Sequence, residues 1–472
     1  MNYNNYDRTV LSEKISRGVI MLINFKVKNF LSIKDLQTLS MVSGATKRKS
    51  ERIVQKTNFG LLKFSAIFGA NASGKSNIIK AFQRMKTIVL KGTPKYIVDE
   101  YFKFDSNTIK DNTYFEVELA INDKFYAYGF QINFLNNAIV DEWLIELKNN
   151  KEYPIFERNV LTSSIDRKDF SKEISKKLDV YIDDVKSDKN ILFLTYLNQN
   201  KAGFYKTNET QIFRDIYLWF ENQLNIANPE TIITSGRYYI IKEHLKQLAK
   251  FLSCFDTGIT DIRIEKSSND ELRLIPSKLI DNIKNDLLND HDRLKGFLIR
   301  ILDDFLILKL DKENSLSIEK VCFYHTENNK TPLTLKEESD GTKRLLDLAE
   351  IILTDDNNKT YIVDELDRCL HPQVTYKFVE LFLSKAANDN FNNQLIVTTH
   401  ESRLLNFEIL RRDEVWFTQK TEGATSLYSL EEFNERFDKK IDKAYLDGRY
   451  GGVPIFETIF PISCIDEDQT TR

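Results

Sequence analysis

The stretch IFGANASGKSNIIK, residues 67–80, places two glycines, a lysine and a serine at the spacing G-x-x-x-x-G-K-S. These four residues are Gly69, Gly74, Lys75 and Ser76. The apolar run LLKFSAIFG (61–69) before the loop predicts a buried strand, and SNIIKAFQRMKTIVL (76–90) has the spacing of a helix. A glycine-rich loop between a strand and a helix is typical of a phosphate-binding loop. The sequence therefore predicts an α/β fold that binds a nucleotide.

Consecutive backbone N–H groups of this loop are expected to surround the β-phosphate at the positive end of the following helix. The candidate phosphate-binding residues are Asn71, Ala72, Ser73, Gly74, Lys75, Ser76 and Asn77. Gly74 permits a backbone shape that a Cβ would obstruct. We expect Lys75 to bridge the β- and γ-phosphates and the Ser76 hydroxyl to bind Mg²⁺, which makes ATP and Mg²⁺ the expected cofactors. The alternative is a lysine-bearing turn without a ligand.

Two later strands end in residues suited to hydrolysis. TYIVDELDRCLHP (360–372) ends its apolar run in Asp364 and Glu365. Asp364 is expected to join the Mg²⁺ shell and Glu365 to polarise the attacking water. QLIVTTHES (394–402) ends its run in His400, which could contact the γ-phosphate. The alternatives are acidic residues that merely end a strand and a structural histidine.

A second anion site is predicted in KEESDGTKRLLDLAEIIL (336–353). A polar turn opens an amphipathic helix there, and its residues are Ser339, Asp340, Gly341 and Thr342. The free N–H groups of this helix start can bind an anion. One chain needs only one such site for one nucleotide, whereas two chains packed head to tail would each offer the turn to the nucleotide of the other. The pattern predicts a homodimer, with a simple capped helix start as the alternative.

The rest of the chain divides by its hydrophobic pattern. MLINFKVKNFLSIKD (21–35) alternates, which places Ile23, Phe25 and Val27 on one strand face. Short alternating strands between 98 and 147 predict an antiparallel β meander. After residue 320, strands and helices alternate as in a mostly parallel sheet.

Residues 206–320 are predicted to form a small, mostly helical domain. Helices are expected over 238–255, after Pro276 with Ser277 as N-cap, and from Leu294 to Ile301. A short coiled-coil arm is the alternative. The expected divisions are an extension (1–20), an N-terminal lobe (21–205), the helical insertion (206–320), a C-terminal lobe (321–460) and a tail (461–472).

Composition excludes several classes of protein. The 472 residues are 42% hydrophobic and carry a net charge of -3, so a globally basic nucleic-acid binder is excluded, although a local basic patch is not. The four cysteines form no C-x-x-C pair, which fits a reducing compartment. No apolar run is long enough to span a membrane and residues 1–20 do not resemble a signal peptide, so a cytoplasmic location is expected.

Together these motifs resemble the ABC-type ATPase head of the SMC and OLD (overcoming lysogenization defect) group over roughly residues 21–460. ESDGTKRLLDL, DELDRCLHP, TTHESRLL, RRDEVWF and YLDGRYGGVP resemble a bacterial branch of AAA-family ATP-binding proteins. The resemblance implies an α/β ATPase head, a mixed central sheet with an antiparallel β meander and an inserted helical domain. Lys75 and Ser76 match the phosphate-loop lysine and Mg²⁺ ligand, Asp364 and Glu365 the Walker B pair, and His400 the switch histidine.

Other matches are partial. Ser339 and Gly341 match the serine and second glycine of the signature, whereas Asp340 and Thr342 replace the glycine and glutamine of transporters. His371 stands where transporters carry an aspartate. The Q-loop glutamine is expected at Gln199, in LFLTYLNQN. These departures argue against a transporter subunit.

This branch is similar to the ATPase subunits of abortive-infection, PARIS and Septu-like anti-phage systems, which implies a separately encoded effector such as a Toprim-like or HNH nuclease. The chain itself holds neither nuclease pattern after residue 460. The alternatives are an SMC-like ATPase of DNA repair or DNA structure maintenance and a nucleotide-gated scaffold with negligible turnover. Nucleic-acid binding and an oligomer larger than a dimer stay open.

Overall fold

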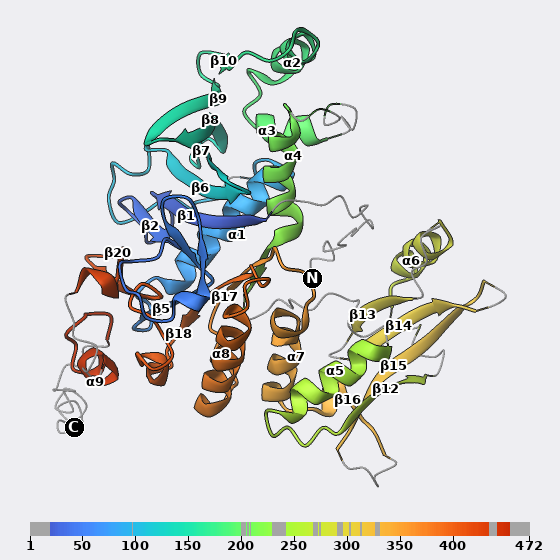
Figure 1. Cartoon of the computed structure of the whole chain (residues 1–472). Helices are drawn as coiled ribbons and strands as arrows, with labels where there is room; N and C mark the ends of the chain where they lie inside the picture. The colour runs from blue at the N-terminus through green and yellow to red at the C-terminus, as the bar shows by residue number, and fades with distance from the viewer. Residues whose placement is uncertain are drawn as a thin grey trace, which may run out of the picture.

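The computed structural model (Figure 1) describes most of the chain. The described residues are 19–96, 98–199, 204, 207, 209–228, 242–267, 272, 275–289, 296–301, 304–311, 314–325, 331–433 and 441–453. The predicted extension 1–20 and tail 461–472 lie almost entirely outside them. None of the described helices combines the length and apolarity needed to cross a membrane.

A six-stranded sheet lies at the centre of the molecule, in the order β11-β17-β18-β5-β19-β20. Its strands are β5 (Phe64–Gly69), β11 (Leu224–Ala227), β17 (Thr360–Val363), β18 (Gln394–Thr399), β19 (Val415–Thr421) and β20 (Ala424–Ser429). The first five in this order pair in parallel, and β20 pairs antiparallel with β19. The predicted mostly parallel sheet is therefore confirmed. β11 belongs to this sheet, so residues 224–227, which the sequence assigned to the insertion 206–320, are part of the sheet instead.

A seven-stranded antiparallel sheet, in the order β10-β9-β8-β7-β6-β1-β2, confirms the predicted meander. Its strands are β1 (Ile20–Lys28), β2 (Gln37–Ser40), β6 (Thr113–Ile121), β7 (Lys124–Asn133), β8 (Ala138–Lys148), β9 (Lys151–Asn159) and β10 (Ser164–Arg167). The small hairpin of β3 (Ile53–Gln55) and β4 (Gly60–Leu62) lies beside it.

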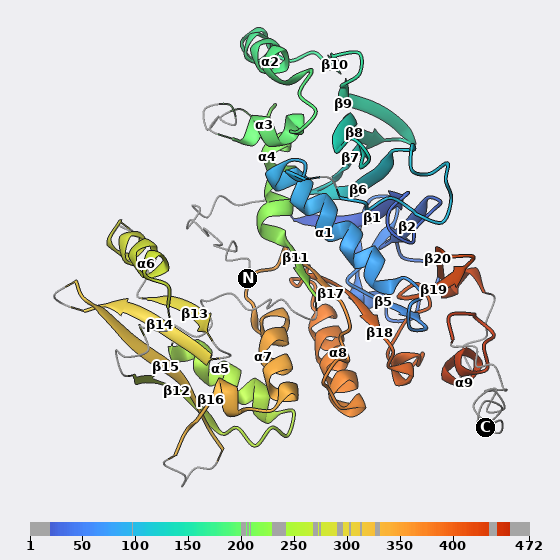
Figure 2. The same ribbon diagram turned by 180° about the vertical axis from the view of Figure 1, so that it is seen from behind.

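Helix α1 (Lys75–Lys91) lies between the two sheets, as Figure 2 shows, and confirms the helix predicted over 76–90. One hydrophobic core joins its apolar side to Phe25 and Val27 of β1 and to Ile67 of β5. Ile23 packs in a separate cluster, so its predicted place on the face of Phe25 is wrong. The cause is an irregularity in the pairing with β6 between Leu22 and Asn24, because one extra residue exchanges the two faces of a strand.

Two helices, α7 (Asp340–Leu353) and α8 (Pro372–Ala386), cover the opposite face of the six-stranded sheet (Figure 1). The other described helical elements outside the inserted domain are α2 (Lys172–Val185), α3 (Phe193–Asn198), α4 (Gln211–Leu218), η3 (Trp219–Gln223), η1 (Ser50–Arg52), η6 (Ser402–Leu404), η7 (Leu430–Glu432) and α9 (Ile441–Leu446). Strand residues alternate between the two cores, since Ile362 and Ile396 face α1 whereas Val363 and Val397 face α7 and α8.

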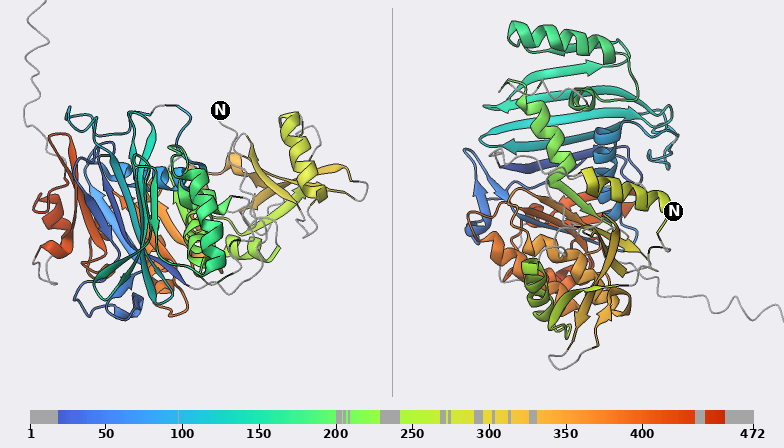
Figure 3. Two further views of the ribbon diagram at one scale, coloured as in Figure 1. Left: turned by 90° about the horizontal axis from the view of Figure 1, so that it is seen from above. Right: turned by 90° about the vertical axis from the view of Figure 1, so that its right-hand side faces the viewer.

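The inserted domain contains a sheet, so the prediction that 206–320 is mostly helical is wrong. Its antiparallel strands are β12 (Asp261–Lys266), β13 (Phe297–Ile301), β14 (Asp304–Leu310), β15 (Leu316–Tyr324) and β16 (Leu333–Thr334), joined to η5 (Leu335–Glu337). Figure 3 shows this domain extending to one side of the two larger sheets. The described residues there contain no pair of long helices that would form a coiled-coil arm.

Two of the three predicted helices are present in this domain, as α5 (Lys242–Ser253) and α6 (Ser277–Asn289). Ser277 is the first helical residue of α6 rather than its N-cap. The helix expected to end at Ile301 is instead β13. A short apolar run fits a helix or a strand equally, and here pairing with β14 decides the outcome.

The carboxyl group of Glu414, directly before β19, gives the fold a pH dependence. Glu414 is 1% exposed and its Oε2 accepts a hydrogen bond from the Arg411 N–H at 2.7 Å. Burial raises the pKa of Glu414 to about 7. The folded state therefore binds this proton more tightly than the unfolded state, and stability falls as pH rises from the unfolded pKa, about 4.3, through the folded one.

Glu414→Gln should lack this dependence. Its unfolding temperature relative to that of the unmodified chain is expected to rise between about pH 5 and about pH 8, measured by circular dichroism. Glu157→Gln, at an exposed position on β9, is the control and should show a constant difference. A constant difference for Glu414→Gln as well would contradict the assigned titration.

Candidate nucleotide-binding site

The predicted phosphate loop connects the end of β5 to the start of α1. Gly74 caps α1 with φ +107°, a left-handed conformation that L side chains rarely adopt. A Cβ at Gly74 would also overlap the Thr425 side chain. Ala72 has a positive φ of 62°. Asn71 and Ala72 are exposed at the tip of the loop, where a ligand can reach their N–H groups.

Side chains on both sides of the loop fix its position. The Ser73 hydroxyl lies 2.6 Å from the Thr418 hydroxyl of β19. Asn77 donates from Nδ2 to the Ser32 hydroxyl at 2.6 Å. Thr425 Oγ1 donates to the Ser73 carbonyl at 3.0 Å. Two of the seven candidate residues thus hold the loop through side chains, a role that the sequence pattern did not predict.

Lys75 points into the loop. Its Nζ donates to the carbonyl oxygens of Gly69 at 2.7 Å and Ala70 at 3.0 Å, and the residue is 5% exposed. Burial lowers the pKa of Lys75 to about 8, although the carboxylates of Asp364, Asp367 and Glu365 act in the opposite direction. A buried cation held only by two neutral carbonyls is suited to an anionic ligand.

Asp364 lies at the carboxyl end of β17, next to the start of α1. Its Oδ1 accepts hydrogen bonds from the Ser76 hydroxyl at 3.2 Å and from the Thr398 hydroxyl at 2.5 Å. Neighbouring ligands around octahedral Mg²⁺, each about 2.1 Å from the ion, lie about 3 Å apart. The Ser76 and Asp364 oxygens therefore fit two positions of a magnesium shell, in which the ion would offset phosphate charge.

Glu365 follows Asp364 in a strained conformation, with φ +50°. Its N–H donates to Thr398 Oγ1 at 2.8 Å. Arg344 of α7, only 6% exposed, donates from Nη2 to the carbonyl oxygens of Asp364 at 3.1 Å and Glu365 at 2.9 Å. The backbone of Glu365 is thus held on both sides, by β18 and by α7.

His400 follows β18 at the same edge of the sheet. The Asp367 carboxylate accepts hydrogen bonds from the Thr399 hydroxyl at 2.7 Å and from the His400 N–H at 3.2 Å. Partial desolvation of the His400 ring by the surrounding protein disfavours the charged imidazolium and lowers the pKa of His400. The positive charge of Lys75 lowers this pKa further. A neutral imidazole can accept or donate a hydrogen bond near a phosphate.

The predicted signature turn lies at the start of α7. The Ser339 hydroxyl caps this helix by accepting the Thr342 N–H at 3.1 Å, whereas Ser339 and Asp340 are otherwise exposed. A Cβ at Gly341 would lie 3.0 Å from the Cys369 carbonyl, so the turn packs closely on the segment after Glu365. Within the described residues, no hydrogen bond joins this turn to the phosphate loop of the same chain.

Gln199 lies away from this site, so the prediction of a Q-loop glutamine there is wrong. It follows α3, which packs on the far part of α1 through a 2.6 Å hydrogen bond from the Thr195 hydroxyl to the Val89 carbonyl. Val89 lies about 20 Å along the helix from Lys75. Gln199 lies between α3 and α4, and both helices precede β11 in the chain. The strand whose end reaches the site is β11, so the prediction chose a segment too early in the sequence.

Sequence reasoning missed three residues of the site. They are Arg344, Asp367 and Thr398. It also missed the end of β11, whose Ala227 carbonyl accepts the Asp364 N–H at 2.8 Å. Asp367 and Thr398 stand within three residues of predicted site residues, and their polar side chains beside an apolar strand were the available signal. Arg344 had no such signal.

Solved structures to which the chain is similar include two SMC heads and a recombination mediator. The SMC head bound to the C-terminal winged-helix domain of ScpA is 14% identical, with 86% of this chain and 97% of that chain covered and a TM-score of 0.37. The SMC head with an extended coiled coil, bound to the C-terminal domain of ScpA, from Pyrococcus furiosus, is 17% identical, with 88% and 97% covered and a TM-score of 0.36. The recombination mediator RecF with ATP, from the RecFOR pathway, is 14% identical, with 88% and 100% covered and a TM-score of 0.29.

No curated protein matches the sequence significantly. Residues 64–406 match a protein family described as "AAA domain, putative AbiEii toxin, Type IV TA system". This match begins at the first residue of β5 and ends after His400, so it includes the phosphate loop, the signature turn and the Walker B pair. The chain belongs to this family of AAA domains, AAA_21.

Proposed function

We propose that the chain is an ATPase whose ATP cycle controls a separately encoded effector in anti-phage defence in the cytoplasm. The observation that carries the ATPase part is the meeting of Lys75, Ser76, Asp364 and Glu365 at one edge of the sheet. The defence part is supported by the family, whose description names a putative AbiEii toxin, and by the resemblance of the motifs to those of anti-phage ATPases.

In the proposed cycle, Lys75 binds the β- and γ-phosphates, and Ser76 and Asp364 hold Mg²⁺. Glu365 orients water for attack on the γ-phosphate and accepts its proton. His400 contacts the γ-phosphate and registers its loss. Asp367 keeps the backbone of His400 in place through the hydrogen bonds described above.

The signature turn is proposed to act on the nucleotide of a second copy of the chain. Ser339 and Asp340 are exposed, and the N–H groups at the start of α7 are suited to an anion. Ser339 and Gly341 would complete the partner's site in a head-to-tail homodimer. The shared γ-phosphate would stabilise the dimer until hydrolysis removes it.

We propose that the inserted domain transmits this change, and its connection to the signature turn supports this role. β16 runs through η5 directly into Ser339. His325 at the end of β15 lies 2.7 Å from the carboxylate of Glu338, which precedes Ser339 and is 7% exposed. Movement of the signature turn would therefore act on the inserted sheet, where we place the effector contact.

Phage plating tests this proposal. Cells carrying the gene with its neighbours should lower plating of at least one phage, and Lys75→Ala should restore it. Lys80→Ala, an exposed lysine on the same helix, is the matched control and should still protect. Equal plating on all strains over a broad phage panel, with the protein present at equal levels, would exclude the defence role.

A further inference from the structure

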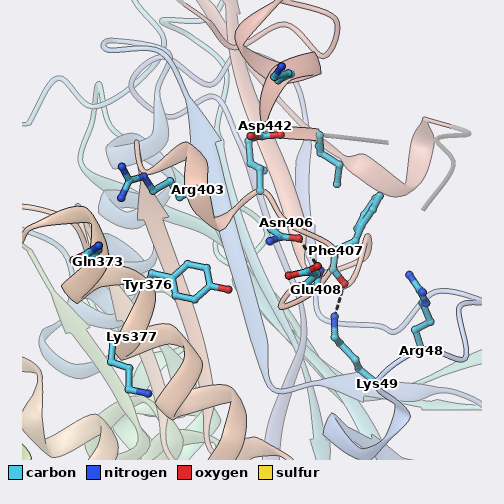
Figure 4. Close-up of a pocket in the computed structure, with 13 residues that line it drawn as sticks. Arg48, Lys49, Gln373, Tyr376, Lys377, Arg403, Asn406, Phe407, Glu408 and Asp442 are labelled. Atoms are coloured by element: carbon cyan, nitrogen blue, oxygen red, sulfur yellow. Dashed lines mark hydrogen bonds between the residues drawn. The ribbon is translucent and has the colours of Figure 1, made fainter. Parts of the chain in front are cut away.

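A groove outside the nucleotide site lies between α8, the turn after η6 and α9 (Figure 4). Its volume is about 1210 Å³. This exceeds the roughly 300–1,000 Å³ of small-molecule pockets, so the groove suits a longer ligand. Arg403 lies three residues after His400, so a ligand here would lie beside the switch segment.

Positive charge is concentrated around the groove. Its basic residues come from four separate elements and are Arg48, Lys49, Lys377, Arg403 and Lys443. Two acidic residues, Glu408 and Asp442, also line it, and Lys377 forms an ion pair with Glu380 at 2.7 Å, which leaves an excess of two positive charges in a chain of net charge -3. Arg403 and Lys443 are exposed, and among the described residues neither has an ion-pair partner. These exposed cations attract a polyanion.

The large apolar side chains that line the groove are directed into the protein core. Leu405 is 1% exposed and Ile441 is 2% exposed, and Phe407 is buried. An amphipathic peptide inserts apolar anchor side chains between exposed apolar ones, and these three residues leave almost none of their surface to such anchors. The accessible groups are instead cations, the amides of Gln373 and Asn406, and the half-buried ring of Tyr376, which projects from α8 into the groove (Figure 4).

From these features we infer that the groove binds single-stranded nucleic acid through its phosphate backbone. Cations spaced along a groove follow successive phosphates, and an aromatic ring between them can stack on a base. The Lys49 ammonium donates to the Phe407 carbonyl at 2.5 Å, which fixes one cation at the rim. The inference does not depend on the proposed defence role.

Fluorescence anisotropy tests the inference with a labelled single-stranded DNA of about 20 nucleotides. The full chain is titrated at several salt concentrations with ADP in excess, so that Lys75 is occupied. Arg403→Gln/Lys443→Gln should bind about tenfold or more weakly, and the slope of log K against log salt should fall by about 1.4, because each lost phosphate contact removes about 0.7.

Lys172→Gln/Lys176→Gln is the matched control. It removes the same charge from exposed positions on α2, far from the groove in Figure 1, and should leave affinity and slope unchanged. Equal unfolding temperatures show that both variants fold. Absence of binding at low salt, or equal losses in both variants, overturns the inference. Displacement of the DNA by polyglutamate at equal charge concentration overturns it in favour of an acidic protein segment.

Discussion

Glu365→Gln should lower kcat for ATP by about 10²–10⁴-fold while Mg–ATP still binds. The amide keeps the size of the side chain but cannot accept the proton of the attacking water. Lys75, Ser76 and Asp364, which bind the nucleotide in the proposed cycle, are unchanged. The strained backbone at φ +50° is held by Thr398 and Arg344 through main-chain atoms, so the substitution should leave it in place.

The same variant should accumulate as an ATP-bound dimer, because in the proposed cycle the γ-phosphate would join the two copies until hydrolysis removes it. Light scattering after size-exclusion chromatography would detect this as a doubled mass with ATP and a single mass with ADP. Glu157→Gln, at an exposed position on β9, should hydrolyse ATP normally. Equal turnover in Glu365→Gln and the unmodified chain would refute the role of Glu365 as base.

Much of this site could be predicted because its residues follow short apolar strands. Asp364 and His400 were expected at strand ends, and the carboxyl ends of neighbouring parallel strands meet at one edge of a sheet. The order β17-β18-β5, which brings them to Lys75, was not readable from the sequence. The hydrophobic pattern of the sequence predicts single helices and strands, whereas the order of strands in a sheet depends on packing between segments that are far apart in the chain.

Three of the errors have the same origin. Ile23 changes faces because of one irregularity in pairing, and the helix expected up to Ile301 became a strand because β14 was available to pair with it. Gln199 was chosen from its place in the chain, yet β11 is the strand that reaches the site. Each error concerns a residue whose position is set by a distant segment rather than by its neighbours.

Arg344→Ala is the second substitution for which we expect a large loss of activity. Arg344 joins α7, the helix that begins at the signature turn, to the Walker B turn formed by Asp364 and Glu365. Its guanidinium is buried and donates to the carbonyl oxygens of Asp364 and Glu365. Arg344→Ala removes both hydrogen bonds, so the backbone of Glu365 loses its support from α7. We expect kcat to fall about 10²-fold, since a displacement of about 1 Å at a catalytic group has an effect of this size.

Mg–ATP affinity should change little in Arg344→Ala, because Lys75 and Ser76 do not contact Arg344. Arg344→Lys keeps a positive donor and should restore part of kcat. Lys80→Ala, at an exposed position on α1, is the control and should leave kcat unchanged. Thermal unfolding separates this effect from a loss of folding.

Steady-state kinetics in ATP would reveal whether Arg344 also connects the two sites of a dimer. The partner's nucleotide would bind at Ser339, on the first turn of α7, and Arg344 extends from the next turn to Glu365 of its own site. Hydrolysis should therefore be cooperative in the unmodified chain and lose cooperativity in Arg344→Ala. If kcat falls but cooperativity persists, Arg344 only positions Glu365, and the two sites communicate through another contact. An unchanged kcat would show that the backbone of Glu365 needs no support from α7.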